Sequence, residues 1–195
     1  MGAEGSKEML FWTKEEYLRF AETIMDKPFS YYDFEMLYWC GIREGELLAL
    51  TPADFDFHNQ TVTINKSYQR LKGRDVITSP KTKKSNRVVK MPQFLSEEME
   101  DCMKLYYSLK PTDRLFPVTK HYLSHEMDRG CKATGVKRIR IHDLRHTHAT
   151  IFLRFFRLFA LDFTNILWCF NRFSCTYGLN YTQISIECGF VVSLA

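Results

Sequence analysis

The sequence predicts a mainly α-helical domain with a small three-stranded antiparallel β-sheet, an α+β fold that is followed by an atypical C-terminal tail. Apolar residues recur at helical spacing near both ends of the first 150 residues, and short stretches between residues 55 and 90 alternate apolar with polar residues. Apolar residues make up 45% of the 195, so one sizeable core can form.

The chain divides into three parts. Residues 1–10 are polar, and we expect a disordered leader or a linker remnant there. Residues 11–150 form the folded domain. Residues 151–195 differ in kind, with 5 charged residues against 45 in the first 150, and with 11 aromatic residues. A charge pattern that stops in mid-helix predicts an altered reading frame or a truncation. The alternative is a tail that binds a partner or packs on itself.

The first helices follow from capping and helix-breaking residues. Thr13 and Glu16 form a capping box, which predicts a helix up to about residue 25 that Pro28 ends. A second apolar helix is expected over residues 32–39, with Gly41 as its breaker. Arg43 then opens a short third helix.

The strands are expected in the middle of the chain. Apolar and polar residues alternate over residues 61–65, and residues 76–77 and 88–89 supply two more short strands. The last hairpin has a strongly basic tip at residues 80–86. Later helices are expected over residues 95–109, 120–134 and 142–153, with Gly135 ending the second of these.

The charge is uneven along the chain. The net charge is +4, but residues 61–91 carry +8 and residues 129–145 carry +5, so the rest of the chain carries −9. This asymmetry predicts a polyanionic partner on one face. The alternative for either stretch alone is a solvated charged surface.

The cysteine pattern and the hydropathy indicate the cellular compartment that we expect for the protein. The six cysteines form no CxxC pair, no secretory signal is present, and no uninterrupted apolar run reaches the length of a membrane span. We expect a cytoplasmic protein with reduced thiols and no membrane association.

Two short motifs carry arginines with a chemical use. In GIREGELLAL (residues 41–50), Arg43 follows a glycine break, and Glu46 lies one helical turn later, where a carboxylate could hold the guanidinium. Arginine offers a rigid fork of donors that matches two phosphate oxygens. In IHDLRHTHAT (residues 141–150), His142 and Arg145 lie three apart, so both point to one side of a helix. Taken alone, the alternatives are an ordinary surface ion pair for the first motif and a buried histidine at a helix start for the second.

Lys81 lies on the basic hairpin tip. A lysine there can swing toward a ligand and donate a proton, although a solvated charge run is the alternative. The ordered combination of GxRxxEL, a hairpin lysine and HxLR opening a helix is much more specific, and it resembles the tyrosine recombinase (phage integrase) family over about residues 11–150. The stretches INKSYQRLKGRDVITSPKTKKSNRVVKMP and RIRIHDLRHTHAT resemble integrases of Firmicutes conjugative transposons and phages.

The resemblance implies site-specific DNA recombination and integration for a mobile element, with no cofactor and no metal. In this family a tyrosine attacks the scissile phosphate, forms a 3′-phosphotyrosyl link and frees a 5′-hydroxyl. Arg43 and Arg145 match the arginines that stabilise the transition state. Lys81 matches the proton donor to the leaving oxygen, and His142 matches the histidine that assists proton transfer. Glu46 matches a supporting acid.

The resemblance weakens after residue 150. The family's Leu-Gly-His motif is absent, but Trp168 and Tyr177 lie 23 and 32 residues after Arg145, at spacings that suit the family's Trp or His and its nucleophilic tyrosine. The family also implies double-stranded DNA as the partner and a tetramer on two DNA sites. Basic residues expected to contact DNA are Lys83, Lys84, Arg87, Arg138 and Arg140.

Two other functions fit parts of the sequence. One is a DNA-binding remnant of an integrase that grips DNA without cutting it. The other is a zinc hydrolase, because His142 and His146 have the i and i+4 spacing of HExxH, with Asp143 in the place of glutamate. No downstream ligand signature supports the zinc site.

Overall fold

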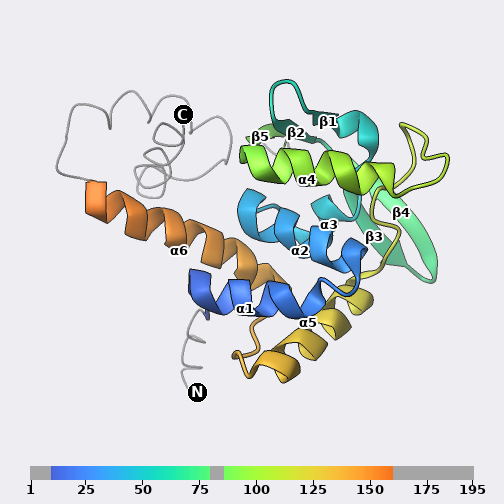
Figure 1. The fold of residues 1–195 in the computed structure, drawn as a ribbon. Coiled ribbons are helices and arrows are strands. Elements are labelled where there is room, and N and C mark those ends of the chain that lie inside the picture. Colours follow the sequence, from blue (N-terminus) through green and yellow to red (C-terminus); the bar gives the residue numbers. More distant parts are fainter. Residues whose placement is uncertain (1–9, 80–85, 160–195) are drawn as a thin grey trace, which may run out of the picture.

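The computed structural model describes the backbone of residues 10–79 and 86–159, and the side chains of residues 10–79 and 86–150 (Figure 1). Among these residues, no helix combines the length and apolarity that crossing a membrane requires. The helices are α1 (Lys14–Ile24), α2 (Pro28–Cys40), α3 (Glu44–Leu47), the 3-10 helix η1 (Pro52–Asp54), α4 (Gln93–Lys104), α5 (Lys120–Thr134) and α6 (Ile141–Phe159). The strands are β1 (Phe55–Asp56), β2 (Thr61–Ile64), β3 (Ser67–Leu71), β4 (Arg74–Thr78) and β5 (Arg87–Lys90).

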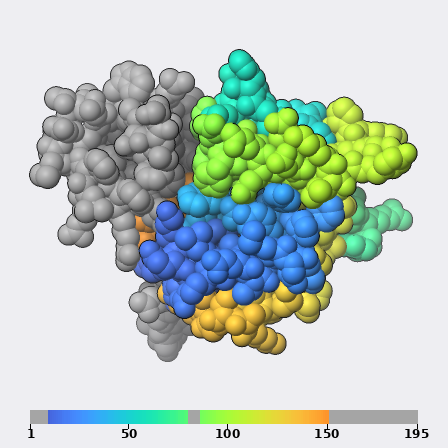
Figure 2. All heavy atoms as spheres, in the orientation of Figure 1, coloured from blue at the N-terminus to red at the C-terminus, as the bar shows by residue number. Residues whose placement is uncertain are grey.

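Helix α2 lies at the centre of the helical part and packs against α1, α3, α4 and α6, while α1 also packs against α5 (Figure 1). Figure 2 shows α1 and α2 as a band between α4 on one side and α5 on the other. Because α2 is covered on several sides, its sequence is apolar almost all round and lacks an amphipathic pattern. The largest fully buried side chains include Trp12, Tyr17, Phe20, Phe34, Tyr38 and Phe116.

The antiparallel sheet has the strand order β1-β2-β5, with Val62 opposite Val89 and Ile64 opposite Arg87. The fold class and the three-stranded sheet are confirmed, but one expected strand is wrong. Residues 76–77 belong to a separate two-stranded ribbon of β3 and β4, and β1 supplies the third strand of the sheet. Strand β3 was not expected, because its sequence SYQRL is mostly polar.

The helix ends follow the capping signals with one correction. Thr13 Oγ1 accepts the Glu16 N–H at 3.2 Å, and Glu16 Oε2 accepts the Thr13 N–H at 2.7 Å, so the capping box is confirmed. Pro28 does not end α1. It begins α2, where the missing N–H of proline costs nothing.

The later helices differ from expectation at their ends. Helix α5 spans the expected 120–134 and ends at Gly135 with φ +70°, whereas α4 ends at Lys104 rather than near residue 109. The backbone of α6 continues beyond residue 150 to Phe159, so the helix crosses the expected boundary of the tail. The remaining tail, and residues 1–9 of the expected leader, lie outside the described residues.

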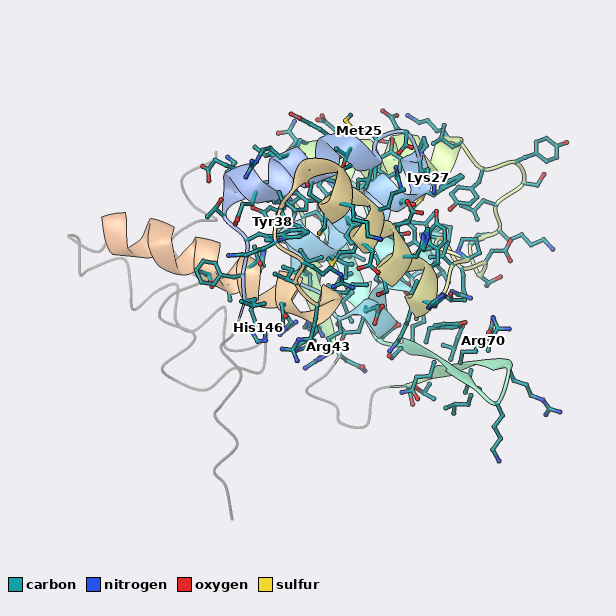
Figure 3. The ribbon with its side chains drawn as sticks, turned by 90° about the horizontal axis from the view of Figure 1, so that it is seen from below. Met25, Lys27, Tyr38, Arg43, Arg70 and His146 are labelled. Carbon is teal, nitrogen blue, oxygen red and sulfur yellow. The ribbon has the colours of Figure 1, made fainter. Side chains whose placement is uncertain are left out.

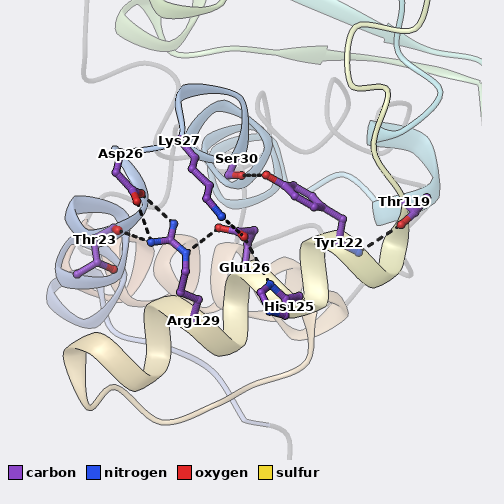
Figure 4. Close-up of polar contacts among 9 residues, drawn as sticks. All are labelled: Thr23, Asp26, Lys27, Ser30, Thr119, Tyr122, His125, Glu126 and Arg129. Atoms are coloured by element: carbon purple, nitrogen blue, oxygen red, sulfur yellow. Dashed lines mark hydrogen bonds and ion pairs between the residues drawn. The ribbon is translucent and has the colours of Figure 1, made fainter.

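A polar cluster ties α5 to the turn between α1 and α2 (Figure 4). The Glu126 carboxylate, 1% exposed, accepts hydrogen bonds from Lys27 Nζ at 2.6 Å and Arg129 Nε at 2.8 Å. Arg129 also binds Asp26 through both terminal nitrogens. Burial alone would raise the pKa of Glu126, but the two cations outweigh burial and lower it. The charged carboxylate is therefore the form that the fold stabilises.

Candidate functional site

The turn between α2 and α3 presents Arg43. Gly41 ends α2 with φ +56°, a left-handed conformation that glycine adopts without strain. A Cβ at this position would lie 2.6 Å from Cδ2 of His148, so the turn also needs the missing side chain. Arg43 follows as the N-cap of α3, with its carbonyl accepting the Glu46 N–H at 2.9 Å. Its side chain is 54% exposed and lies outside the core.

The expected pairing of Arg43 with Glu46 is present. Glu46 Oε1 accepts a hydrogen bond from Arg43 Nη1 at 2.9 Å, and Glu46 Oε2 accepts the Arg43 N–H at 2.9 Å. The carboxylate thus caps α3 and holds the side chain of its N-cap residue at the same time.

Arg87, on β5, contacts the same carboxylate from the sheet. Its Nη1 and Nη2 donate to Oε1 and Oε2 of Glu46 at 3.1 and 2.7 Å. Only 3% of the Arg87 side chain is exposed, so its burial behind Glu46 leaves almost none of it for the expected contact with DNA. Burial would raise the pKa of Glu46, but hydrogen bonds and charge from Arg87, with those from Arg43, lower it.

Helix α6 brings Arg145 and His142 to the same turn. Arg145 Nη1 donates to the Gly41 carbonyl at 2.6 Å. Burial lowers the pKa of His142, and the His146 ring and the Arg145 guanidinium lower it further. The charge of Arg43 acts on His142 in the same direction, so these side chains form one electrostatic cluster. The lowered pKa of His142 favours its neutral ring, which can accept a proton.

His146 also belongs to this cluster, although the sequence indicated it only as a candidate zinc ligand. Its ring meets the ring of His142 edge-on, with centroids 5.2 Å apart. Figure 3 draws Arg43 and His146 at the same edge of the molecule. The i, i+4 spacing of the two histidines was the available signal, but it favoured a metal site. Among the described residues no group of three or more His, Cys, Asp or Glu side chains could hold a metal ion, so the zinc alternative gains no support.

His148 fixes α6 against α2 behind the cluster. Its Nδ1 lies 2.9 Å from the Tyr38 carbonyl, which makes Nδ1 the protonated nitrogen. Burial lowers its pKa to about 4, so the ring is neutral. The packing of α6 against α2 and this buried hydrogen bond help to hold Arg145 beside Gly41.

Of the other expected site residues, some pair with carboxylates and some lie outside the described residues. Arg138 Nε lies 2.5 Å from Asp128, and Arg140 binds both oxygens of Asp143 while its side chain stays 70% exposed. With Arg129 bound to Asp26, part of the second basic stretch is neutralised by neighbouring carboxylates. Expected residues that lie outside the described ones are Lys81, Lys83, Lys84, Trp168 and Tyr177.

With this geometry in view, comparison with known proteins decides the family. The model of the phage integrase family matches residues 11–155. The chain belongs to this family. The match covers α1 to most of α6, including the turn of Arg43 and the start of α6, and it confirms the resemblance to tyrosine recombinases.

The curated relatives of this integrase-family chain come from mobile elements. The chain is 30% identical over 161 residues to the ICEBs1 integrase of Bacillus subtilis, a match that covers 75% of this chain and 44% of that protein. It is 28% identical over 125 residues to the integrase of Mycobacterium phage L5, covering 59% of this chain and 34% of that protein. The chain thus spans less than half of the length of these relatives.

Solved structures show the same fold at lower identity. The Tn1549 transposon integrase (aa 82–397), solved in complex with circular intermediate DNA, has a TM-score of 0.68 at 21% identity, covering 76% of this chain and 56% of that one. The XerA recombinase has a TM-score of 0.61 at 22% identity, covering 78% and 52%. Both likenesses support the mainly helical fold with a small antiparallel sheet.

Proposed function

We propose that this chain is the catalytic part of a tyrosine-type site-specific DNA recombinase that integrates a mobile element. The observation that carries the proposal is the cluster of Arg43, His142 and Arg145 at the turn between α2 and α3. Two guanidiniums at one edge suit a phosphate diester, because each can offer paired donors to non-bridging oxygens. Membership of the phage integrase family supports duplex DNA as the source of that phosphate.

The proposed reaction needs no cofactor. Tyr177 attacks the scissile phosphorus, and the bond to the 5′-oxygen breaks as the phosphotyrosyl bond forms. Arg43 and Arg145 stabilise the negative charge that gathers on the non-bridging oxygens. Neutral His142 takes up or relays the tyrosine proton, and Lys81 donates a proton to the leaving 5′-oxygen. Rejoining reverses these steps, because the phosphotyrosyl link keeps the energy of the broken bond.

A second candidate is a DNA-binding remnant that does not cut. The low charge of residues 151–195 favours it, because Tyr177 and Trp168 both fall in that tail. In that case Arg43 and Arg145 grip phosphate, but no covalent link forms.

A nicked suicide substrate separates the two functions. Cleavage beside the nick releases a short fragment, so the covalent protein–DNA adduct accumulates and is seen by denaturing electrophoresis. We expect an adduct with the unaltered chain and none with Tyr177→Phe, while Tyr181→Phe serves as the matched control. Binding of the same DNA without any adduct supports the remnant, and no Arg43-dependent binding at all contradicts both functions.

A further inference from the structure

We propose that Arg87 is a positioning residue, which holds both oxygens of Glu46 and thereby fixes the Arg43 guanidinium in the orientation that grips a DNA phosphate. This inference rests on the proposed function and adds to it a residue from the sheet that touches no substrate.

The Glu46 carboxylate is fully used. Oε1 receives Nη1 of Arg43 and Nη1 of Arg87, and Oε2 receives the Arg43 N–H and Nη2 of Arg87, at 2.7 to 3.1 Å. A carboxylate has about four lone-pair sites, so these four donors occupy all of them. The carboxylate therefore cannot turn without breaking a charged hydrogen bond.

Arg43 depends on this carboxylate for its direction. The guanidinium contacts Glu46 through Nη1 while 54% of the side chain is exposed. A long exposed side chain loses conformational freedom when it is held, so a firm anchor is needed to keep it in one rotamer. Because a guanidinium has five N–H donors, one contact to Glu46 leaves donors for a phosphate.

The burial of Arg87 points to a role in orientation. Only 3% of its side chain is exposed, and its Nε is buried without a hydrogen-bond partner among the described residues. An apolar side chain at this position would avoid both the burial of a charge and the unpartnered Nε. A buried ion pair is therefore weak evidence that Arg87 is there to stabilise the fold. The bidentate contact, in contrast, sets the plane of the Glu46 carboxylate and so connects the sheet to the turn of Arg43.

A double-mutant cycle tests the inference through DNA affinity at fixed salt. We expect Arg87→Met to weaken binding of a duplex recombination site by about tenfold, the scale of one charged hydrogen bond, and Arg87→Lys by less. In the Arg43→Ala background, the same Arg87→Met change should weaken binding by less than about twofold, because a residue that acts through Arg43 has nothing left to position.

Arg129→Met is the matched control. It also removes a guanidinium from a buried carboxylate, Glu126, but in the contact of α5 with the turn between α1 and α2. We expect it to lower stability in urea without changing DNA affinity. If Arg87→Met does not fold, Arg87→Lys replaces it in the double-mutant cycle, because lysine keeps the charge and loses the second hydrogen bond.

Side-chain NMR of Arg43 gives a reading that does not depend on DNA. Rotation of its guanidinium should be hindered in the unaltered chain and become fast in the Arg87 variants, but not in Arg129→Met. If Arg43→Ala weakens binding and Arg87→Met weakens it equally in both backgrounds, the positioning role is wrong and the proposed function stands. If Arg43→Ala leaves affinity unchanged, the proposed function is wrong and the inference falls with it.

Discussion

Gly41 combines a left-handed backbone with contact to the His148 ring. Gly41→Ala should therefore lower the free energy of unfolding by at least about 2 kcal/mol, from backbone strain and overpacking together. Gly135 is the matched control, because its φ is +70° but no described residue beyond its chain neighbours lies within 4 Å of the position that a Cβ would take. Gly135→Ala should cost only the strain, about 1 kcal/mol. Equal losses in urea denaturation would show that His148 does not restrict the turn.

Glu35 is a buried carboxyl group in α2 that accepts hydrogen bonds from Tyr17 and Trp39. Burial raises its pKa to about 7, from an ordinary value of 4.5. The folded chain therefore binds this proton more tightly than the unfolded chain, and the stability from Glu35 is present below about pH 4.5 and lost as the pH rises through 7.

Glu35→Gln removes the titrating group but keeps a side chain that can accept hydrogen bonds. We expect urea denaturation between about pH 5 and pH 8 to show stability falling with pH more steeply in the unaltered chain than in Glu35→Gln. Parallel curves for the two proteins would contradict a raised pKa at Glu35.

The sequence was sufficient to predict the pairing of Arg43 with Glu46, because a helix fixes the relation of residues three apart. It did not indicate the burial of Arg87, for a physical reason. In the strand RVVK either Arg87 and Val89 or Val88 and Lys90 can face the core, and the burial of Arg87 depends on Glu46 reaching it from another element. A strand pattern carries no such long-range information.

Helix α5 is held to the α1–α2 turn by Glu126 (Figure 4). Glu126→Gln should lower the free energy of unfolding by about 1–3 kcal/mol, discounted from a fully buried pair because Lys27 and Arg129 are partly exposed. Asp101→Asn is the control, since the Asp101–Lys104 pair is exposed and should make no measurable difference. A similar result for both variants in urea denaturation would contradict a stabilising role of the buried carboxylate.

Element boundaries were predictable where a capping residue or glycine acts alone, as at Thr13 and Gly135. They were not predictable where tertiary contacts decide. Strand β3 is polar, and its hairpin turns at Lys72 and Gly73 with φ +48° and +79°, without the usual Asn-Gly signal. The ribbon is instead held by Arg114, which stacks 3.9 Å over the Tyr68 ring.

The basic face of the protein is smaller than its count of basic residues predicted. Arg129, Arg138 and Arg140 each pair with a carboxylate, so the second basic stretch offers less net charge to a polyanion than its sequence suggests. The net charge of a stretch of sequence does not include the carboxylates that the fold brings next to it from other elements. Phosphate binding should therefore rest more on the cluster at the α2–α3 turn than on general surface charge.

The dependence of DNA affinity on salt is a direct measure of phosphate contacts by this cluster. Each lost phosphate contact should reduce the slope of log affinity against log salt by about 0.9. We predict that Arg43→Ala and Arg145→Ala each weaken binding and reduce the slope by this amount, while Arg129→Ala changes neither. Slopes for Arg43→Ala and Arg145→Ala that equal the slope of the unaltered chain would contradict a phosphate-gripping role for the two arginines.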